Sequence, residues 1–288
     1  MTFQKKPSWL KRRLPSGPEF ERTRRRIQQQ NLHTVCQEAH CPNIFECFSQ
    51  QTATFLILGD HCTRDCSFCA VRKGFGEPVD FDEPKRVAEA AREMGLRYVV
   101  LTSVTRDDLA DGGAEHYAQT IQALRCAIDN VSIEVLIPDF QGNHDALLMV
   151  LSAGPSVLNH NLETVPRLYP KVRPQADYNR SLALLAQASA YAPHIPTKSG
   201  LMLGLGETTD EIEQTLLDLR ASNCRILTLG QYLQPSPAHH PVKQFVTPDT
   251  FDRLRATALD MGFDQVASGP FVRSSYHAKE VFKKIKLQ

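Results

Sequence analysis

From about residue 53 onward, the sequence alternates short apolar runs with longer amphipathic segments. Each of the first six apolar runs has the length of a strand and is followed by a segment with helical periodicity. Repeated strand–helix pairs favour α/β architecture with a parallel sheet. So many pairs in one row favour a complete or partial (βα) barrel over a doubly wound sheet, and we expect a partial (βα)6-type barrel. Strands are expected at 54–58, 98–102, 133–137, 157–160, 200–203, 226–229 and 265–267, and helices at 83–94, 114–129, 144–153, 179–191, 210–222 and 248–261.

Local signals mark the ends of several of these helices. Pro84 fits the first turn of a helix, and Gly95 is placed as its C-cap. Thr208 or Thr209 begins another helix, and Gly262 ends the last one. No internal repeat or linker divides the core. The chain is therefore predicted to have an N-terminal extension (1–52), a barrel (53–264) and a C-terminal tail (265–288).

Composition limits the partners that the chain can have. Its 288 residues carry 33 Lys and Arg against 32 Asp and Glu, a net charge of +1, so no overall field points to nucleic acid or a membrane. Residues 1–26 are strongly basic, which fits either an arm that docks an acidic partner or a solvated terminus. No run of 18 apolar residues predicts a membrane-spanning helix, and the basic N-terminus lacks the apolar core of a secretory signal.

Six of the eight cysteines fall into two triplets. Three thiolates are one too few for a closed zinc site or for a fully ligated [4Fe–4S] cluster. Each triplet can therefore hold a cluster and leave one iron open to another ligand. Clustered, reduced cysteines indicate a reducing compartment, so a cytoplasmic protein is expected, and pairing into disulfides is disfavoured. The triplets are Cys36, Cys41 and Cys47, and Cys62, Cys66 and Cys69.

The second triplet directly follows the first expected strand. Reactive groups of barrel enzymes lie at the carboxyl ends of the strands, so this triplet occupies the expected place for chemistry. The alternative is a zinc site closed by His61 or His40. Zinc sites usually have other cysteine spacings, and the adjacent His61 would be strained as a ligand.

The spacing Cys-x3-Cys-x2-Cys, with Phe68 before the last cysteine, resembles the radical S-adenosylmethionine (SAM) superfamily. The resemblance implies that the amino and carboxylate groups of SAM chelate the open iron. An electron from the cluster then cleaves the sulfonium and releases a 5′-deoxyadenosyl radical. A cofactor is needed for this chemistry, because no protein side chain abstracts hydrogen from an unactivated alkyl carbon.

The first triplet narrows the resemblance to the lipoyl synthase family, which residues 30–278 resemble. In that family a serine of the Arg-Ser-Ser-Tyr tail completes the ligand set of an auxiliary [4Fe–4S] cluster, which here implies Ser275, with Ser274 as the second candidate. A serine oxygen is a poorer iron ligand than a thiolate, which suits a cluster that is dismantled. Without the resemblance, two adjacent serines would indicate a turn or a helix cap. The supporting segments are 159–167, 198–207, 231–236 and 269–278.

Several polar or aromatic residues near strand ends are candidates for binding SAM, although packing or helix capping would also explain them. Gly204 and Gly206 lack the third glycine of a dinucleotide motif and instead indicate close backbone approach to a ligand. Cys126 and Cys224 are expected to be small core residues. The SAM candidates are Phe68, Thr102, Asn161, Glu163 and Gln234.

The resemblance implies a sulfurtransferase that inserts sulfur at C6 and C8 of an octanoyl chain on a lysine of a lipoyl carrier domain. One SAM is consumed for each C–H bond, and the auxiliary cluster donates the sulfur. The implied partners are the octanoylated carrier (a 2-oxoacid dehydrogenase E2 or the glycine cleavage H protein), an electron donor such as ferredoxin or flavodoxin, and a protein that rebuilds the cluster. Two alternatives remain: a zinc-stabilised binding module, and another radical SAM sulfur-transferring enzyme, such as a methylthiotransferase or a relative of biotin synthase.

Overall fold

The computed structural model describes residues 5–11, 17–50 and 52–286, which divide into two compact units. Among these residues, the first unit contains 17–64 and 70–158. The second unit contains 5–11, 65–69 and 159–286. The chain thus leaves the first unit between Arg64 and Asp65, within the second cysteine triplet, and re-enters it after Cys69.

The first unit is built on parallel strands. β2 (Thr54–Ile57), β5 (Tyr98–Ser103) and β6 (Ser132–Leu136) pair side by side, and β7 (Val157–Asn159) follows β6 in the order. The short β1 (His33–Thr34) pairs antiparallel with β2. β2 and β5 are buried over most of their length, as expected of parallel strands that are covered on both faces.

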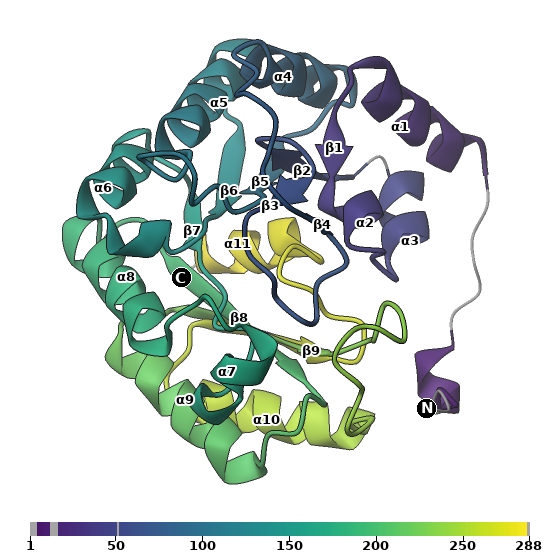
Figure 1. The fold of residues 1–288 in the computed structure, drawn as a ribbon, viewed down its shortest axis with the longest axis vertical. Helices are drawn as coiled ribbons and strands as arrows, with labels where there is room; N and C mark the ends of the chain where they lie inside the picture. The colour runs from purple at the N-terminus through teal and green to yellow at the C-terminus, as the bar shows by residue number, and fades with distance from the viewer. Residues whose placement is uncertain (1–4, 12–16, 51, 287–288) are drawn as a thin grey trace. The chain divides into compact units, whose positions relative to one another are not determined.

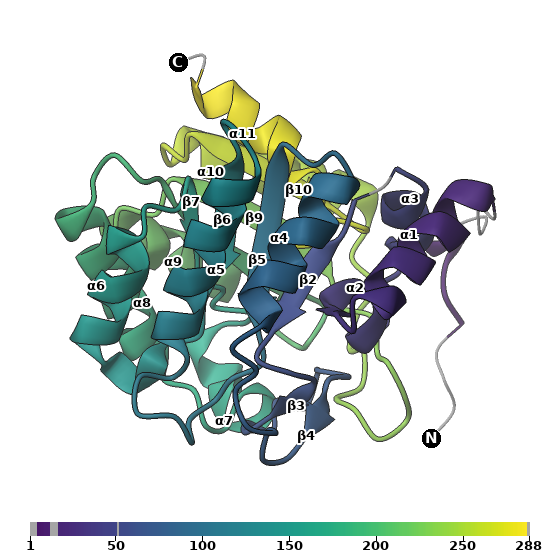
Figure 2. The same ribbon diagram turned by 90° about the horizontal axis from the view of Figure 1, so that it is seen from above.

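Three helices pack beside one another along these strands, as Figures 1 and 2 show. On α5 a stripe of fully buried side chains, Tyr117, Ile121 and Leu124, follows the helical period. The buried carboxylate of Glu83 lies 2.7 Å from His116 Nε2 and accepts the Leu58 N–H at 2.8 Å, which ties two helices to the end of β2. The helices are α4 (Glu83–Glu93), α5 (Ala114–Ala127) and α6 (His144–Ser152).

Residues before β2 also belong to this unit and form helices that the sequence did not predict. α1 (Pro18–Gln29) packs on α3 (Ile44–Ser49), and the short α2 (Val35–Glu38) lies between them in sequence. The ring of Phe20 stacks on that of Phe45, with their centroids 5.1 Å apart, and the Thr23 hydroxyl donates to the Phe48 carbonyl at 2.8 Å.

The second unit continues the strand–helix alternation. β9 (Ile226–Gln231) lies between β8 (Thr197–Leu203) and β10 (Gln265–Gly269), all parallel. Its core is one hydrophobic cluster that includes Leu201, Leu216 and Phe251. The helices are α7 (Tyr169–Val172), α8 (Tyr178–Tyr191), α9 (Thr209–Ala221), α10 (Pro248–Asp260) and α11 (Ala278–Lys286).

The predicted alternation is confirmed. All six expected helices are present, with ends within two residues of those predicted, and β8 begins at Thr197 rather than at residue 200. Thr208 caps α9 in a capping box with Glu211, and Gly95 adopts a φ of 66° after α4. The domain boundaries at 52 and 264 stay predictions. Among the described residues, no helix has the length and apolar character needed to cross a bilayer.

Candidate functional site

Cys62 is held on both sides within the first unit. It ends the short strand β3 (His61–Cys62), which pairs with β4 (Arg72–Lys73), and its carbonyl accepts the Gly74 N–H at 2.9 Å. The next residue, Thr63, donates both its N–H and its hydroxyl to the Thr105 carbonyl, each at 3.0 Å. The backbone around Cys62 is therefore fixed to the loop after β5.

Cys66 and Cys69 form a turn that is anchored in the second unit. Between them, the Ser67 N–H donates to the Val172 carbonyl at 3.0 Å, and the Ser67 carbonyl accepts the His240 N–H at 2.8 Å. Phe68 packs against the hydrophobic cluster of this unit. The loop after β9 that contributes His240 is itself fixed by Gln231.

The Gln231 side chain is completely buried and fully bonded. Its amide nitrogen lies 3.0 Å from three carbonyl oxygens, and its amide oxygen accepts the Val246 N–H at 2.7 Å. One residue thus joins the end of β9 to the loop that follows it. The three carbonyls belong to Leu203, Tyr232 and Gln244.

The thiols of Cys41 and Cys47 lie near enough to that of Cys36 to affect it electrostatically, within the first unit. Cys36 lies on α2, Cys47 lies on α3, and the Cys41 N–H donates to the Cys36 carbonyl at 3.1 Å. Burial raises the pKa of the Cys36 thiol far above its usual value, and the negative charges of Cys41 and Cys47 raise that pKa further. Buried thiolates that repel one another are stabilised when they bind a metal.

The donor chemistry of both triplets fits iron–sulfur clusters. Among the described residues, no cysteine forms a disulfide bond. Across 5–11, 17–50 and 52–286, no three His, Cys, Asp or Glu side chains are grouped as they would be around a single metal ion. The thiolates of a [4Fe–4S] cluster bind separate irons and surround the cluster, which is a different arrangement.

Three of the predicted site residues meet in the second unit. The Asn161 amide nitrogen donates to Glu163 Oε1 at 3.0 Å and to Ser274 Oγ at 3.2 Å. Asn161 Oδ1 is buried and has no hydrogen-bond partner among the described residues. Burial raises the pKa of the Glu163 carboxyl above its usual value, while Arg173, Asn161 and Arg273 oppose that rise. The structure thus brings Asn161 and Glu163 next to Ser274 of the tail, a contact that the sequence analysis did not predict. The binding of SAM by Asn161 and Glu163 stays a prediction.

The side chains of Thr102 and Gln234 form hydrogen bonds to backbone carbonyls and so stabilise the fold. The Thr102 hydroxyl donates to the Leu136 carbonyl at 3.0 Å, between β5 and β6. The Gln234 amide donates to the His239 carbonyl at 3.0 Å, within its own loop. Their binding of SAM stays a prediction, as it does for Phe68.

Glycines let chain segments cross strand ends closely. A Cβ on Gly230 would lie 2.1 Å from the Val272 carbonyl oxygen, and a Cβ on Gly200 would lie 2.4 Å from the Thr228 hydroxyl. At Gly204, which we expected to admit a ligand, the chain's own Gln244 carbonyl would lie 2.3 Å from an added Cβ. The tail segment that leads to Ser274 therefore requires glycine in β9.

Gly230→Ala is expected to lower the free energy of unfolding by about 1–3 kcal/mol, because backbone must move to admit the methyl group. Gly269→Ala is the matched control. Gly269 pairs with Gly230 in the sheet, but its added Cβ would lie 3.6 Å from a Val272 methyl, an ordinary contact. Denaturant unfolding of both variants measures the difference, and equal stabilities would contradict the close crossing.

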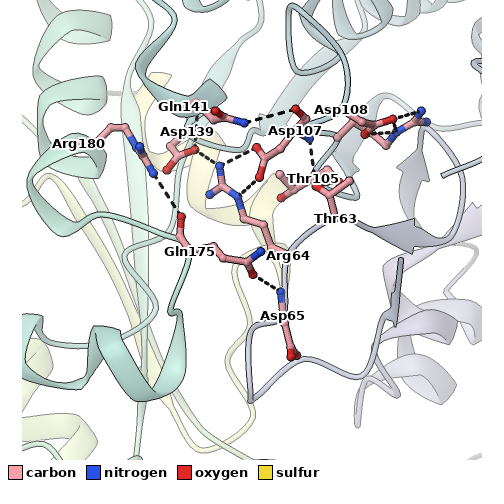
Figure 3. Close-up of polar contacts among 11 residues, drawn as sticks. Thr63, Arg64, Asp65, Thr105, Asp107, Asp108, Asp139, Gln141, Gln175 and Arg180 are labelled. Atoms are coloured by element: carbon pink, nitrogen blue, oxygen red, sulfur yellow. Dashed lines mark hydrogen bonds and ion pairs between the residues drawn. The ribbon is translucent and has the colours of Figure 1, made fainter. Parts of the chain in front are cut away.

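Sequence reasoning missed an ionic cluster beside the second triplet. Arg64, two residues after Cys62, binds Asp107 and Asp139 (Figure 3). Its only signal in the sequence is an arginine between two of the cysteines. The carboxylates are remote in sequence and could not have been assigned to it.

Comparison with known proteins agrees with these features. The sequence model of the radical SAM superfamily matches residues 56–219, and that of the N-terminal domain of lipoyl synthase matches residues 2–41. A lipoyl synthase of Desulfotalea psychrophila is 57% identical over 98% of this chain and 94% of its own. One from Caldicellulosiruptor saccharolyticus is 53% identical over 98% of this chain and 99% of its own.

Solved structures with low sequence identity share the fold. Methylornithine synthase superposes with a TM-score of 0.55 at 15% identity, covering 91% of this chain and 81% of its own. The hydrogenase maturase HydG from Carboxydothermus hydrogenoformans superposes with a TM-score of 0.55 at 17% identity, covering 80% of this chain and 65% of its own. The predicted partial (βα)6-type barrel of the radical SAM kind is thereby confirmed. Because both family models match and lipoyl synthases align with nearly the whole chain at more than half identity, the chain belongs to the lipoyl synthase family of radical SAM enzymes.

Proposed function

We propose that this chain is a sulfurtransferase that converts an octanoyl group on a lipoyl carrier protein into a lipoyl group. Sulfur enters at C6 and C8 of the chain, and one SAM is consumed for each C–H bond. The observation that carries the proposal is the first triplet, which a radical SAM enzyme does not need for making its radical. The names and the near-complete alignment of the relatives support the same activity.

Cys62, Cys66 and Cys69 are the proposed ligands of the radical-generating cluster. When bound, this cluster and SAM supply the radical that removes hydrogen, and the auxiliary cluster supplies sulfide. Cys62 is held by Thr63 and Gly74, so its backbone is preorganised for iron. The buried, unpartnered Asn161 Oδ1 supports a role for Asn161 and Glu163 in binding the polar groups of SAM.

Cys36, Cys41, Cys47 and Ser275 are the proposed ligands of the auxiliary cluster. The electrostatic effect of Cys41 and Cys47 on the Cys36 thiol supports their part of this set. The Arg-Ser-Ser-Tyr tail at 273–276 supports Ser275 as the fourth ligand, with Ser274 as the second candidate. Two separate clusters are needed for a chemical reason, because one cluster must stay intact while the other is broken down.

The proposed partners follow from this reaction. They are the octanoylated E2 or H protein, a low-potential electron donor such as ferredoxin or flavodoxin, and a protein that rebuilds the auxiliary cluster. We propose a cytoplasmic location, because the clusters need a reducing compartment. The basic segment 1–26 could attract an acidic carrier, although residues 1–4 and 12–16 lie outside the described residues.

The full chain, purified without oxygen and reconstituted, is expected to contain about eight irons, four for each cubane. With reductant, SAM and a peptide carrying octanoyl-lysine, it is expected to form lipoyl-lysine and one 5′-deoxyadenosine for each C–H bond replaced. Mass spectrometry of the peptide measures the product, and an assay without SAM is the control. About four irons, or 5′-deoxyadenosine without sulfur insertion, would contradict the proposal.

A further inference from the structure

Arg64 lies between the first two cysteines of the second triplet, yet its guanidinium is buried. Its Nε donates to Asp107 Oδ2 at 2.7 Å, and its Nη2 donates to Asp107 Oδ1 at 2.9 Å and to Asp139 Oδ1 at 2.5 Å (Figure 3). The side chain of Arg64 is 5% exposed, and that of Asp139 is 1% exposed. Asp107 follows β5, and Asp139 follows β6.

These contacts hold the Arg64 side chain in one position. The planar guanidinium engages one carboxylate through two parallel bonds, the arrangement that gives arginine pairs their directional specificity. Removal of one partner from a buried ion pair leaves an uncompensated charge and is strongly destabilising. Asp139 is further fixed, because it accepts the Gln141 N–H at 3.1 Å at the start of the turn η2 (Phe140–Gly142).

The contacts of Arg64 act on the backbone that directly follows Cys62. Besides its own bond to Thr105, the Thr63 hydroxyl accepts the Asp107 N–H at 3.0 Å. Thr63 and Arg64 are thus both joined to the loop after β5, within the first unit. Cys66 has its own anchors in the second unit, where the Asp65 N–H donates to Gln175 Oε1 at 2.5 Å.

We propose that Arg64 is a positioning residue for the radical-generating cluster. Held by Asp107 and Asp139, it fixes the backbone of Cys62 on the ends of β5 and β6 and so sets how this thiolate is presented to iron. The inference rests on the proposed function, in which Cys62 is a cluster ligand. Side chains that orient metal ligands affect metal affinity or activity by about 10–100-fold when they are changed.

Arg64→Lys tests the proposal, because lysine keeps the charge and loses the two-bond geometry. Arg106→Lys is the matched control. Arg106 binds Asp108 through Nε and Nη2, and the two pairs have almost equal exposure: 5% and 24% for Arg64 and Asp107, 4% and 23% for Arg106 and Asp108. Arg106 follows β5 and does not lie between cysteines.

Both full-length variants are reconstituted without oxygen and compared by iron content and by the electron paramagnetic resonance spectrum of the reduced protein with and without SAM. The spectral change on adding SAM reports on the cluster with an open iron. For Arg64→Lys, the SAM concentration that produces half of this change is expected to rise by about 10–100-fold. For Arg106→Lys, it is expected to stay within about twofold of that of the unsubstituted chain.

The proposal is overturned if Arg64→Lys responds to SAM like the unsubstituted chain. It is also overturned if Arg106→Lys weakens the response to SAM as much as Arg64→Lys does. Should Arg64→Lys fail to fold by circular dichroism, Asp139→Asn decides, because its amide oxygen can still accept from Arg64. A weakened SAM response in Asp139→Asn supports the proposal, and an unchanged one overturns it. If the unsubstituted chain responds to SAM without forming lipoyl-lysine, the proposed function fails and this inference stands.

Discussion

Cys62→Ala is expected to abolish both 5′-deoxyadenosine and lipoyl product. Three thiolates are the minimum that holds a cubane with one open iron, and Cys62 has no neighbouring cysteine that could replace it. Because enzyme rate enhancements are at least of order 10⁶, loss of the radical source should lower turnover by more than about 10³-fold. Cys66→Ala and Cys69→Ala are expected to have the same effect.

The measurement pairs iron analysis with quantification of both products. Each of these variants should lose about four irons, because one cubane is lost. Cys126→Ala is the control. The prediction that Cys126 lies in the core is wrong, because it is exposed on α5, outside both triplets. If Cys62→Ala still cleaved SAM, the assignment of the second triplet as the radical site would be wrong.

Cys36→Ala, in contrast, is expected to separate the two chemistries. Sulfur insertion should fall to background, while 5′-deoxyadenosine should still form, because the ligands of the radical-generating cluster are unchanged. Cys36 is buried on α2, and the charges of Cys41 and Cys47 act on its thiol, so the substitution removes one of the three proposed cysteine ligands. Full lipoyl product from this variant would show that the sulfur comes from elsewhere.

The proposed serine ligand can be tested in the same assay. Ser275→Ala is expected to lower sulfur insertion and leave SAM cleavage in place. Ser274→Ala is the matched control, since it removes the adjacent hydroxyl that accepts from Asn161. A larger loss of sulfur insertion in Ser274→Ala would exchange the two assignments.

The barrel elements could be predicted because their signals are local and strong. Buried strands such as β5 read as continuous apolar runs, and the helix α9 begins at a capping box that is visible in sequence. α1 was missed because its sequence is highly charged, and only Thr23 and Ile27 are buried on it. Its helical state depends on packing against Phe45, which a local pattern does not reveal.

The same distinction applies to the site. The proposed cysteine ligands could be found from their spacing within a few residues, whereas Arg64 contacts partners that lie 43 and 75 residues away. Gly230 likewise looks like an ordinary strand glycine until the carbonyl of Val272 is found above it. Contacts set by tertiary packing of this kind have no signature in one sequence.

The bonding of Gln231 limits how this scaffold can diversify. A glutamate there would turn a carboxylate oxygen toward three carbonyl oxygens. A leucine would remove the amide donor from those carbonyls and leave the Val246 N–H without its acceptor. Laboratory evolution of this scaffold should therefore tolerate changes at exposed Pro237 and Ala238, in the same loop, and reject them at Gln231.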